Sequence, residues 1–190
     1  MTVDRVVVGI TGASGIPIAV ATVEAFAEHC EVVTIVTDAA KSVMAHERGD
    51  REATMRHIEE LSAAVYSEDA VHAPIASGSV AVDGMVIVPA SMNTVAAVAT
   101  GRSDTLVSRA ADVTLKERRK LVVVPRETPL SELHLENLLK LARMGVDIVP
   151  PVLGFYFDPQ EPEDFIEHVV GKVLERFDVD HDRYDSWDPQ

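Results

Sequence analysis

The sequence predicts one α/β domain, in which a doubly wound, mostly parallel sheet lies between two layers of helices. The chain has 190 residues, enough for a single domain with a buried core. Hydrophobic residues make up 47% of it and aromatic residues only 5%, so Val, Ala, Ile and Leu must form the core. Their short apolar runs alternate with amphipathic segments, which favours a parallel sheet covered by helices on both faces.

The predicted strands and helices alternate along the chain. We expect strands at residues 3–10, 31–37, 84–88, 121–124 and 147–149, with another short strand within 63–71. We expect helices at residues 16–29, 38–47, 52–61, 94–100, 104–117, 130–144 and 163–177. Residues 1–177 would form the domain. Residues 178–190 would form a charged tail, and Trp187 indicates that this tail docks at the site or on a neighbouring subunit.

The longest predicted helix, 130–144, carries the clearest local signals. Thr128 is expected to cap it, with Pro129 at its first position, and Gly145 is expected to end it. His134 within it is interpreted as a structural residue. The helix should bury one stripe of leucines, at positions 130, 133, 138 and 141.

Charge and composition exclude several classes of protein. A net charge of −14 argues against general nucleic-acid binding, because a polyanion would be repelled. We expect a cytoplasmic protein, since the sequence has neither a signal peptide nor an apolar run long enough to span a membrane. The single cysteine, Cys30, excludes an intramolecular disulfide and a multi-cysteine metal site, and a buried thiol is the favoured interpretation. No metal-ligand cluster is expected.

The strand at 121–124 ends in Pro125-Arg126-Glu127, and a helix follows almost at once. Ligands of open α/β sheets bind beyond the carboxyl ends of the strands, so a cation beside a carboxylate here favours chemistry. A solvated ion pair on a loop is the alternative. Arg109 and Lys116 lie seven residues apart and therefore share one helix face.

Two other strand ends carry small hydrogen-bonding residues. The first strand leads into Gly12-Ala13-Ser14-Gly15 and then a helix, an arrangement that presents backbone N–H groups to a phosphate. The glycine spacing differs from the dinucleotide fingerprint, and a plain tight turn remains the alternative. Thr37 ends the second strand. The strand at 84–88 leads to Ser91, Asn93 and Thr94, whose groups suit a flavin ring edge or a ribityl chain.

Three further segments are ambiguous in isolation. The Ala76–Ser79 element is either a flexible loop near a ligand or a simple connection. The apolar loop at 152–159, with Tyr156, is expected to contact a ligand or another subunit. Glu47 alone is explained by the polar face of a helix.

Taken in order, these motifs resemble the UbiX-type flavin prenyltransferase family. They are GASG at 12–15, ASGS at 76–79, PASMNT at 89–94, SRAADVTLKERR at 108–119, PRETPLSELHLENLL at 125–139 and GFY at 154–156. The resemblance runs from residue 6 to about residue 177, and Trp187 matches a tryptophan in the family's tail. It implies a flavodoxin-like to Rossmann-like fold, a metal-independent enzyme, a homo-oligomer of the dodecamer type, and active sites at subunit interfaces.

The resemblance also implies the reaction and its partners. A dimethylallyl group passes from dimethylallyl phosphate to N5 and C6 of reduced FMN. The product, prenylated FMN, is the cofactor of UbiD-type decarboxylases. The donor's chain length, and the preference for phosphate over pyrophosphate, stay open.

Site residues are carried over from the family's motifs position by position. The residues that would bind FMN are Gly12, Ala13, Ser14, Thr37, Ser91, Met92, Asn93, Thr94 and Arg126. Those that would bind the prenyl donor are Tyr156, Lys172, Lys116, Glu127, Arg109 and Trp187. Lys116 and Arg126 are expected to stabilise charge on the leaving phosphate. Glu47 and Glu127 are the candidates for proton handling, with the division between them open.

Two rival functions remain. A flavin-dependent cysteine decarboxylase would share the PASMNT-like segment, but the charged LKERR and PRE motifs are foreign to that group and a second cysteine is lacking. A non-catalytic FMN-binding subunit would not need Lys116, Arg126, Glu127, Tyr156 and Lys172, all of which are present.

Overall fold

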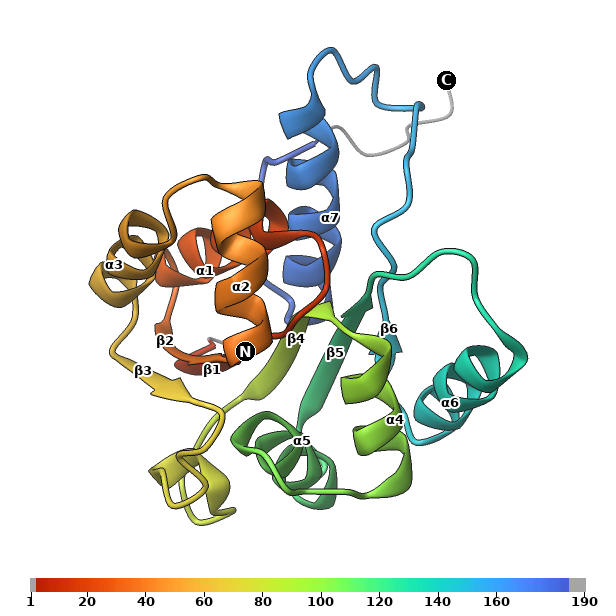
Figure 1. The fold of residues 1–190 in the computed structure, drawn as a ribbon. Helices are drawn as coiled ribbons and strands as arrows, with labels where there is room; N and C mark the ends of the chain where they lie inside the picture. The colour runs from red at the N-terminus through yellow and green to blue at the C-terminus, as the bar shows by residue number, and fades with distance from the viewer. Residues whose placement is uncertain (1–2, 185–190) are drawn as a thin grey trace.

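The computed structural model describes residues 3–184, which form a six-stranded sheet between two layers of helices (Figure 1). The strand order is β3-β2-β1-β4-β5-β6, and every neighbouring pair is parallel. The strands are β1 (Arg5–Ile10), β2 (Glu31–Val36), β3 (Ala64–Ser67), β4 (Gly84–Ala90), β5 (Lys120–Pro125) and β6 (Asp147–Ile148). The predicted doubly wound α/β fold is therefore confirmed.

The helices cover both faces of the sheet (Figure 1). They are α1 (Ile16–Ala27), α2 (Asp38–Glu47), α3 (Arg51–Leu61), α4 (Met92–Thr100), α5 (Leu106–Lys116), α6 (Glu132–Arg143) and α7 (Pro162–Arg176), with a short 3₁₀ turn at Pro74–Ala76. One core lies between the sheet and the group α1, α2, α3 and α7, and the other lies beneath α4, α5 and α6. Alternate residues of β1 serve the two cores, Val6 the first and Val7 the second, so the strand is apolar throughout.

The point where the winding of the sheet reverses lies between β1 and β4. Hydrogen bonds join the two strands just beyond their carboxyl ends. The Thr11 hydroxyl donates to the Pro89 carbonyl at 2.7 Å and accepts from the Ser91 N–H at 2.8 Å. Ligands of doubly wound sheets bind at such a reversal point.

The start of α6 differs from the prediction. Its N-cap is Ser131, whose side chain accepts from the His134 N–H at 3.3 Å, while the His134 ring accepts from the Ser131 N–H. Thr128 and Pro129 lie outside the helix. The reciprocal cap satisfies two backbone N–H groups, which Thr128 could not do for a helix that begins four residues later. His134 is thus structural, as predicted, and Gly145 follows the helix in a left-handed conformation.

The predicted leucine stripe of α6 is wrong for two of its four members. Leu141 is fully buried, whereas Leu130 is 41% and Leu133 is 62% exposed, and Leu138 is half-buried. The reason is that α6 lies at the side of the molecule (Figure 1), where it packs against α4 and β6 and its other face is left exposed. No helix within residues 3–184 has both the length and the apolar run that a bilayer crossing requires.

Candidate functional site

A cavity of about 240 Å³ opens at the point where the sheet reverses. It is lined by Thr11, Gly12, Thr37, Ala39, Glu68, Ser91, Asn93, Thr94, Ala97, Arg102, Asp104, Thr105, Val107 and Ser108. Five of the predicted FMN-binding residues are among them. Since ligand pockets usually measure about 300–1,000 Å³, this cavity fits part of a ligand of FMN size, such as its phosphate and ribityl chain.

Three helix N-termini meet at this cavity. Thr37 caps α2 through the Ala40 N–H at 3.1 Å, Ser91 caps α4 through the Thr94 N–H at 3.3 Å, and Thr105 caps α5. Each N-terminus carries partial positive charge and leaves backbone N–H groups without partners inside its helix. The cavity is therefore suited to an anion such as a phosphate.

Gly12 permits the close approach of α2 to the turn after β1. A Cβ atom at position 12 would lie 2.4 Å from the Cβ of Ala39, a distance that real Cβ atoms do not tolerate. Both residues line the cavity. The glycine therefore sets the shape of the cavity wall, which is a physical reason for the GASG motif apart from any turn conformation.

The N-terminus of α1 is occupied by a carboxylate of the chain itself. Glu47 accepts hydrogen bonds from the N–H groups of Gly15 at 3.0 Å and Ile16 at 2.8 Å. Burial would raise the pKa of Glu47, but hydrogen bonds from Ser14, Gly15 and Ile16, together with the nearby charge of Arg126, outweigh it and lower the pKa. The first helix thus offers these two N–H groups to Glu47. Glu68 likewise occupies part of two other helix ends, since its carboxylate accepts from the Asp38 N–H of α2 at 2.8 Å and its carbonyl from the Leu106 N–H of α5 at 2.7 Å. A phosphate would use the N–H groups that remain at the starts of α2, α4 and α5.

Arg126 and Glu127 follow β5 as predicted, in different surroundings. Arg126 is half-buried beside Glu47, and its Nε is buried with no hydrogen-bond partner among the described residues. A buried guanidinium donor without a partner is costly in a folded protein, so this atom is suited to an acceptor on a ligand. Glu127 is exposed and accepts from the Thr128 N–H at 3.0 Å.

Tyr156 and Lys172 meet at a second, mostly apolar cavity of about 280 Å³ beyond the end of β6. The Tyr156 hydroxyl lies 2.8 Å from Nε2 of His168. The Lys172 ammonium donates to Glu175 at 3.2 Å and lies 4.8 Å from the ring centre of Tyr184. Burial lowers the pKa of Lys172, but Tyr184 and Glu175 outweigh it and raise the pKa, so the group is a cation.

Lys116 and Arg109 line neither of these two cavities. Lys116 ends α5, just before β5 begins, whereas Arg126 follows the other end of β5. A strand of six residues spans roughly 20 Å, so one chain cannot bring these two cations to the same phosphate. Lys116 is exposed and paired with Glu117.

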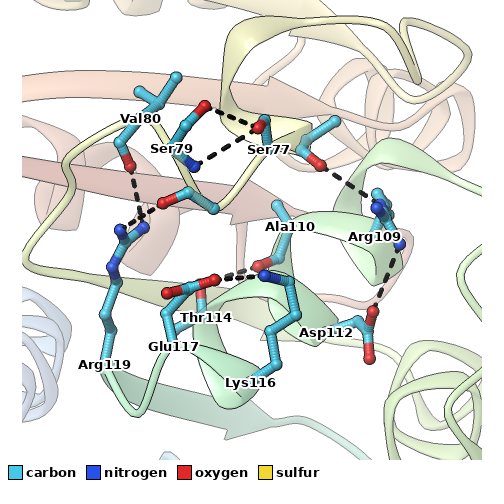
Figure 2. Close-up of polar contacts among 12 residues, drawn as sticks. Ser77, Ser79, Val80, Arg109, Ala110, Asp112, Thr114, Lys116, Glu117 and Arg119 are labelled. Atoms are coloured by element: carbon cyan, nitrogen blue, oxygen red, sulfur yellow. Dashed lines mark hydrogen bonds and ion pairs between the residues drawn. The ribbon is translucent and has the colours of Figure 1, made fainter.

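The Ala76–Ser79 element is held against α5 and is not a free loop (Figure 2). Arg119 donates to the carbonyls of Gly78 and Val80, both at 2.9 Å, and Arg109 donates to the Ala76 carbonyl at 3.3 Å. Gly78 lies so close to the Lys116–Glu117 pair that a Cβ there would clash with both side chains. The ASGS and LKERR motifs therefore form one surface, which presents Lys116.

The remaining predicted site residues differ in how far they are buried. Ala13 and Met92 are buried in the protein, whereas Ser14 is exposed. Trp187 lies outside the described residues. Sequence reasoning did not single out Thr11, Glu68, Thr105 or Ser108, although the Thr105–Ser108 spacing is that of a helix cap. No group of three metal-ligating side chains converges within the described part of the chain.

Known proteins resemble this chain closely in sequence and in structure. The Flavoprotein family model matches residues 1–176. The flavin prenyltransferase LpdB of Lactiplantibacillus plantarum is 47% identical over 97% of this chain and 98% of its own. The crystal structure of AnUbiX in complex with FMN and dimethylallyl pyrophosphate has a TM-score of 0.93 and 39% identity, with 98% of each chain covered. The dodecameric FMN-dependent UbiX-like decarboxylase of Escherichia coli O157:H7 has a TM-score of 0.93 and 42% identity, with 97% of this chain and 100% of that chain covered.

The fold and the first cavity define a Rossmann-like α/β protein with a candidate ligand site at the reversal point of its sheet. With relatives of this similarity over almost the whole chain, the protein belongs to the Flavoprotein family, and within it to the UbiX-type flavin prenyltransferases.

Proposed function

We propose that this protein transfers a dimethylallyl group from dimethylallyl phosphate to N5 and C6 of reduced FMN, and so makes prenylated FMN. The observation that carries the proposal is the buried Arg126 Nε, which has no hydrogen-bond partner within residues 3–184. It lies beside Glu47, whose pKa is lowered, at the sheet edge where the N-termini of α2, α4 and α5 line the first cavity. Relatives named flavin prenyltransferases share 39–47% of their residues with this chain.

The residues of the first cavity fit FMN. Gly12, Thr37 and Ser91 would take the phosphate at the helix N-termini, and Asn93 and Arg126 would reach toward the ring system. Ala13 and Met92 would contribute through their backbone, and Ser14 and Thr94 through hydroxyl groups. Reduced FMN, when bound, supplies the nucleophilic N5 and C6 atoms.

The cations act on the leaving group. When the C–O bond of the donor breaks, its electron pair leaves with the phosphate, and positive charges near the phosphate stabilise the growing negative charge. Arg126 and Lys172 can supply this from one chain, with Tyr156 as a hydrogen-bond donor. Lys116, at the opposite edge of the sheet, would have to come from a neighbouring subunit.

The two carboxylates, Glu47 and Glu127, would have different roles in proton transfer. A lowered pKa makes Glu47 a poor proton donor, so it would remain an anion that orients Arg126 and balances its charge. Glu127 is exposed at the strand end and is our candidate for proton transfer.

The site is completed by assembly. Exposed apolar side chains gather on α6 and on the loop after β6, at Leu133, Leu135, Leu139, Val152, Leu153 and Phe155. Such a surface is typical of a subunit interface, and the related Escherichia coli protein is described as dodecameric. We propose the same assembly here, with the 178–190 tail, including Trp187, docked at the site or on a neighbour, and a cytoplasmic location as predicted from the sequence.

A reconstitution experiment tests the function together with its partner. The purified protein is incubated without oxygen with FMN, a reductant and dimethylallyl phosphate, or dimethylallyl pyrophosphate, and the filtrate is added to a UbiD-type decarboxylase that lacks its cofactor. We expect decarboxylation to begin only when protein, flavin and donor were all present. An inactive decarboxylase in every mixture, with FMN bound to the protein, would favour the non-catalytic binding subunit.

A further inference from the structure

His168 on α7 is a buried polar residue that the proposed mechanism does not use. Its side chain is only 7% exposed, and its Nε2 lies 2.8 Å from the Tyr156 hydroxyl. Its ring is stacked on Phe157, with centres 4.6 Å apart and planes inclined by 15°, and it meets the edge of Tyr184 at 4.8 Å. The contacts with Phe157 and Tyr184 hold the imidazole ring in one orientation. Through its hydrogen bond, the imidazole then holds the Tyr156 hydroxyl in position.

The charge state of His168 follows from its neighbours. Burial lowers its pKa, and so does the charge of Lys172 one helical turn further along, while Glu175 opposes them. Among residues 3–184, the other titratable groups that meet its ring are the phenols of Tyr156 and Tyr184. At neutral pH the imidazole is therefore uncharged and carries a single ring hydrogen.

The ring nitrogen that carries this hydrogen determines whether the Tyr156 hydroxyl accepts or donates in its hydrogen bond with His168. Nδ1 of His168 is buried and has no hydrogen-bond partner among the described residues. A buried N–H without an acceptor is rarer than an unsatisfied acceptor, which favours the hydrogen on Nε2. Nε2 then donates to the Tyr156 oxygen. The Tyr156 hydroxyl is the acceptor in this hydrogen bond, so it does not donate its own hydrogen to His168.

We propose that His168 is a positioning residue for Tyr156, which it orients so that the phenol donates its hydrogen to a phosphate oxygen of the prenyl donor beside Lys172. The inference rests on the proposed function, since it deepens the role of the Tyr156–Lys172 cavity. His168, Tyr156 and Lys172 all line that cavity.

The test uses three variants of His168 in the full-length protein. His168→Phe keeps the aromatic stack and removes the hydrogen bond, His168→Gln places an amide nitrogen near the position of Nε2, and His168→Asn reaches only the position of Nδ1. His57→Phe is the matched control, because His57 is a half-exposed histidine of α3 that pairs with Glu24 of α1 and does not line the Tyr156–Lys172 cavity.

Two quantities are measured for each variant, the calorimetric Kd for dimethylallyl phosphate and the steady-state kinetics of flavin prenylation. Loss of one such hydrogen bond is worth about a factor of ten, so His168→Phe and His168→Asn should raise Kd and KM about tenfold and leave kcat within about twofold. His168→Gln should restore most of the affinity. Adding His168→Phe to Tyr156→Phe should cost little more than Tyr156→Phe alone, because the histidine acts through the phenol.

The outcomes separate the inference from the function on which it rests. If the unaltered protein neither binds the donor nor prenylates flavin, the proposed function fails. If it does both while His168→Phe has unchanged Kd and KM, or His168→Gln is as impaired as His168→Asn, then His168 has no positioning role. Additive losses in the double variant would also overturn it.

Discussion

The Glu47 carboxylate accepts a 2.8 Å hydrogen bond from the backbone N–H of Ile16, and so occupies the N-terminus of α1. In many strand–turn–helix units this position holds a ligand phosphate. Here the chain supplies its own anion, which places a negative charge beside Arg126. Under the proposed function the ligand phosphate would therefore use the N–H groups that remain at the starts of α2, α4 and α5, where Glu68 already accepts from the Asp38 N–H of α2.

The first prediction concerns stability and pH. The pKa of Glu47 is lower in the folded protein than its ordinary value of 4.5, so its contribution is complete above that value and is lost as the pH falls through the folded pKa. Glu47→Gln should therefore lower the free energy of unfolding at neutral pH by about 1–3 kcal/mol, the usual value of hydrogen bonds to a charged group.

Urea unfolding at neutral pH and at about pH 4 checks this, since the two proteins should become more alike in acid. Glu52→Gln, at an exposed position on α3, is the control and should change little at either pH. If the free energies of unfolding of Glu47→Gln and the unaltered protein differed by the same amount at both pH values, the ionised state of Glu47 would be contradicted.

The second prediction concerns the cavity wall. Gly12→Ala should lower the free energy of unfolding by about 1–3 kcal/mol and weaken FMN binding, because the new methyl group overlaps Ala39. Ala39→Gly removes the opposing methyl group, so the double variant Gly12→Ala/Ala39→Gly should recover FMN affinity in a fluorescence titration. A double variant no better than Gly12→Ala would show that the contact does not shape the site.

The third prediction concerns the subunit interface. If Lys116 and Arg126 serve one phosphate from two chains, Lys116→Ala and Arg126→Ala should each reduce prenylation by about 100-fold, the usual cost of removing one such electrostatic group. Dissociating the two variants and reassembling them together should restore about a quarter of the sites, as random mixing in a symmetric oligomer requires. Mixed oligomers no more active than the separate variants would exclude a shared site.

The fourth prediction separates the two carboxylates. Glu127→Gln should keep FMN bound, because Glu127 is exposed outside the first cavity, and should slow prenylation by about 100-fold or more if it transfers a proton. Glu132→Gln, also exposed and close by at the start of α6, is the matched control. Single-turnover measurements that give equal rates for Glu127→Gln and the unaltered protein would remove Glu127 from the mechanism.

The fold could be predicted because its signals are local. The buried strands are apolar along their whole length, and each helix has one apolar face, so their order along the chain follows directly. The site positions that follow from strand ends, such as Thr37, Ser91 and Arg126, could be predicted in the same way.

Other features depend on contacts between distant segments. Glu47 is an ordinary polar residue in the sequence, and only the packing of α2 beside the turn after β1 brings it to Ile16. The exposed leucines of α6 have the spacing of a core stripe, and periodicity does not say whether the same chain or a neighbour covers them. The bond between His168 and Tyr156 joins a helix to an irregular loop, for which no pattern exists.

The most direct test of the central claim is the mass of the flavin after the reaction. The protein is incubated without oxygen with FMN, a reductant and dimethylallyl phosphate, and the flavin is analysed by mass spectrometry. We expect a flavin heavier by one five-carbon prenyl unit, formed only when the protein is present. Unmodified FMN, recovered from protein that had bound both FMN and the donor, would contradict the assignment as a flavin prenyltransferase.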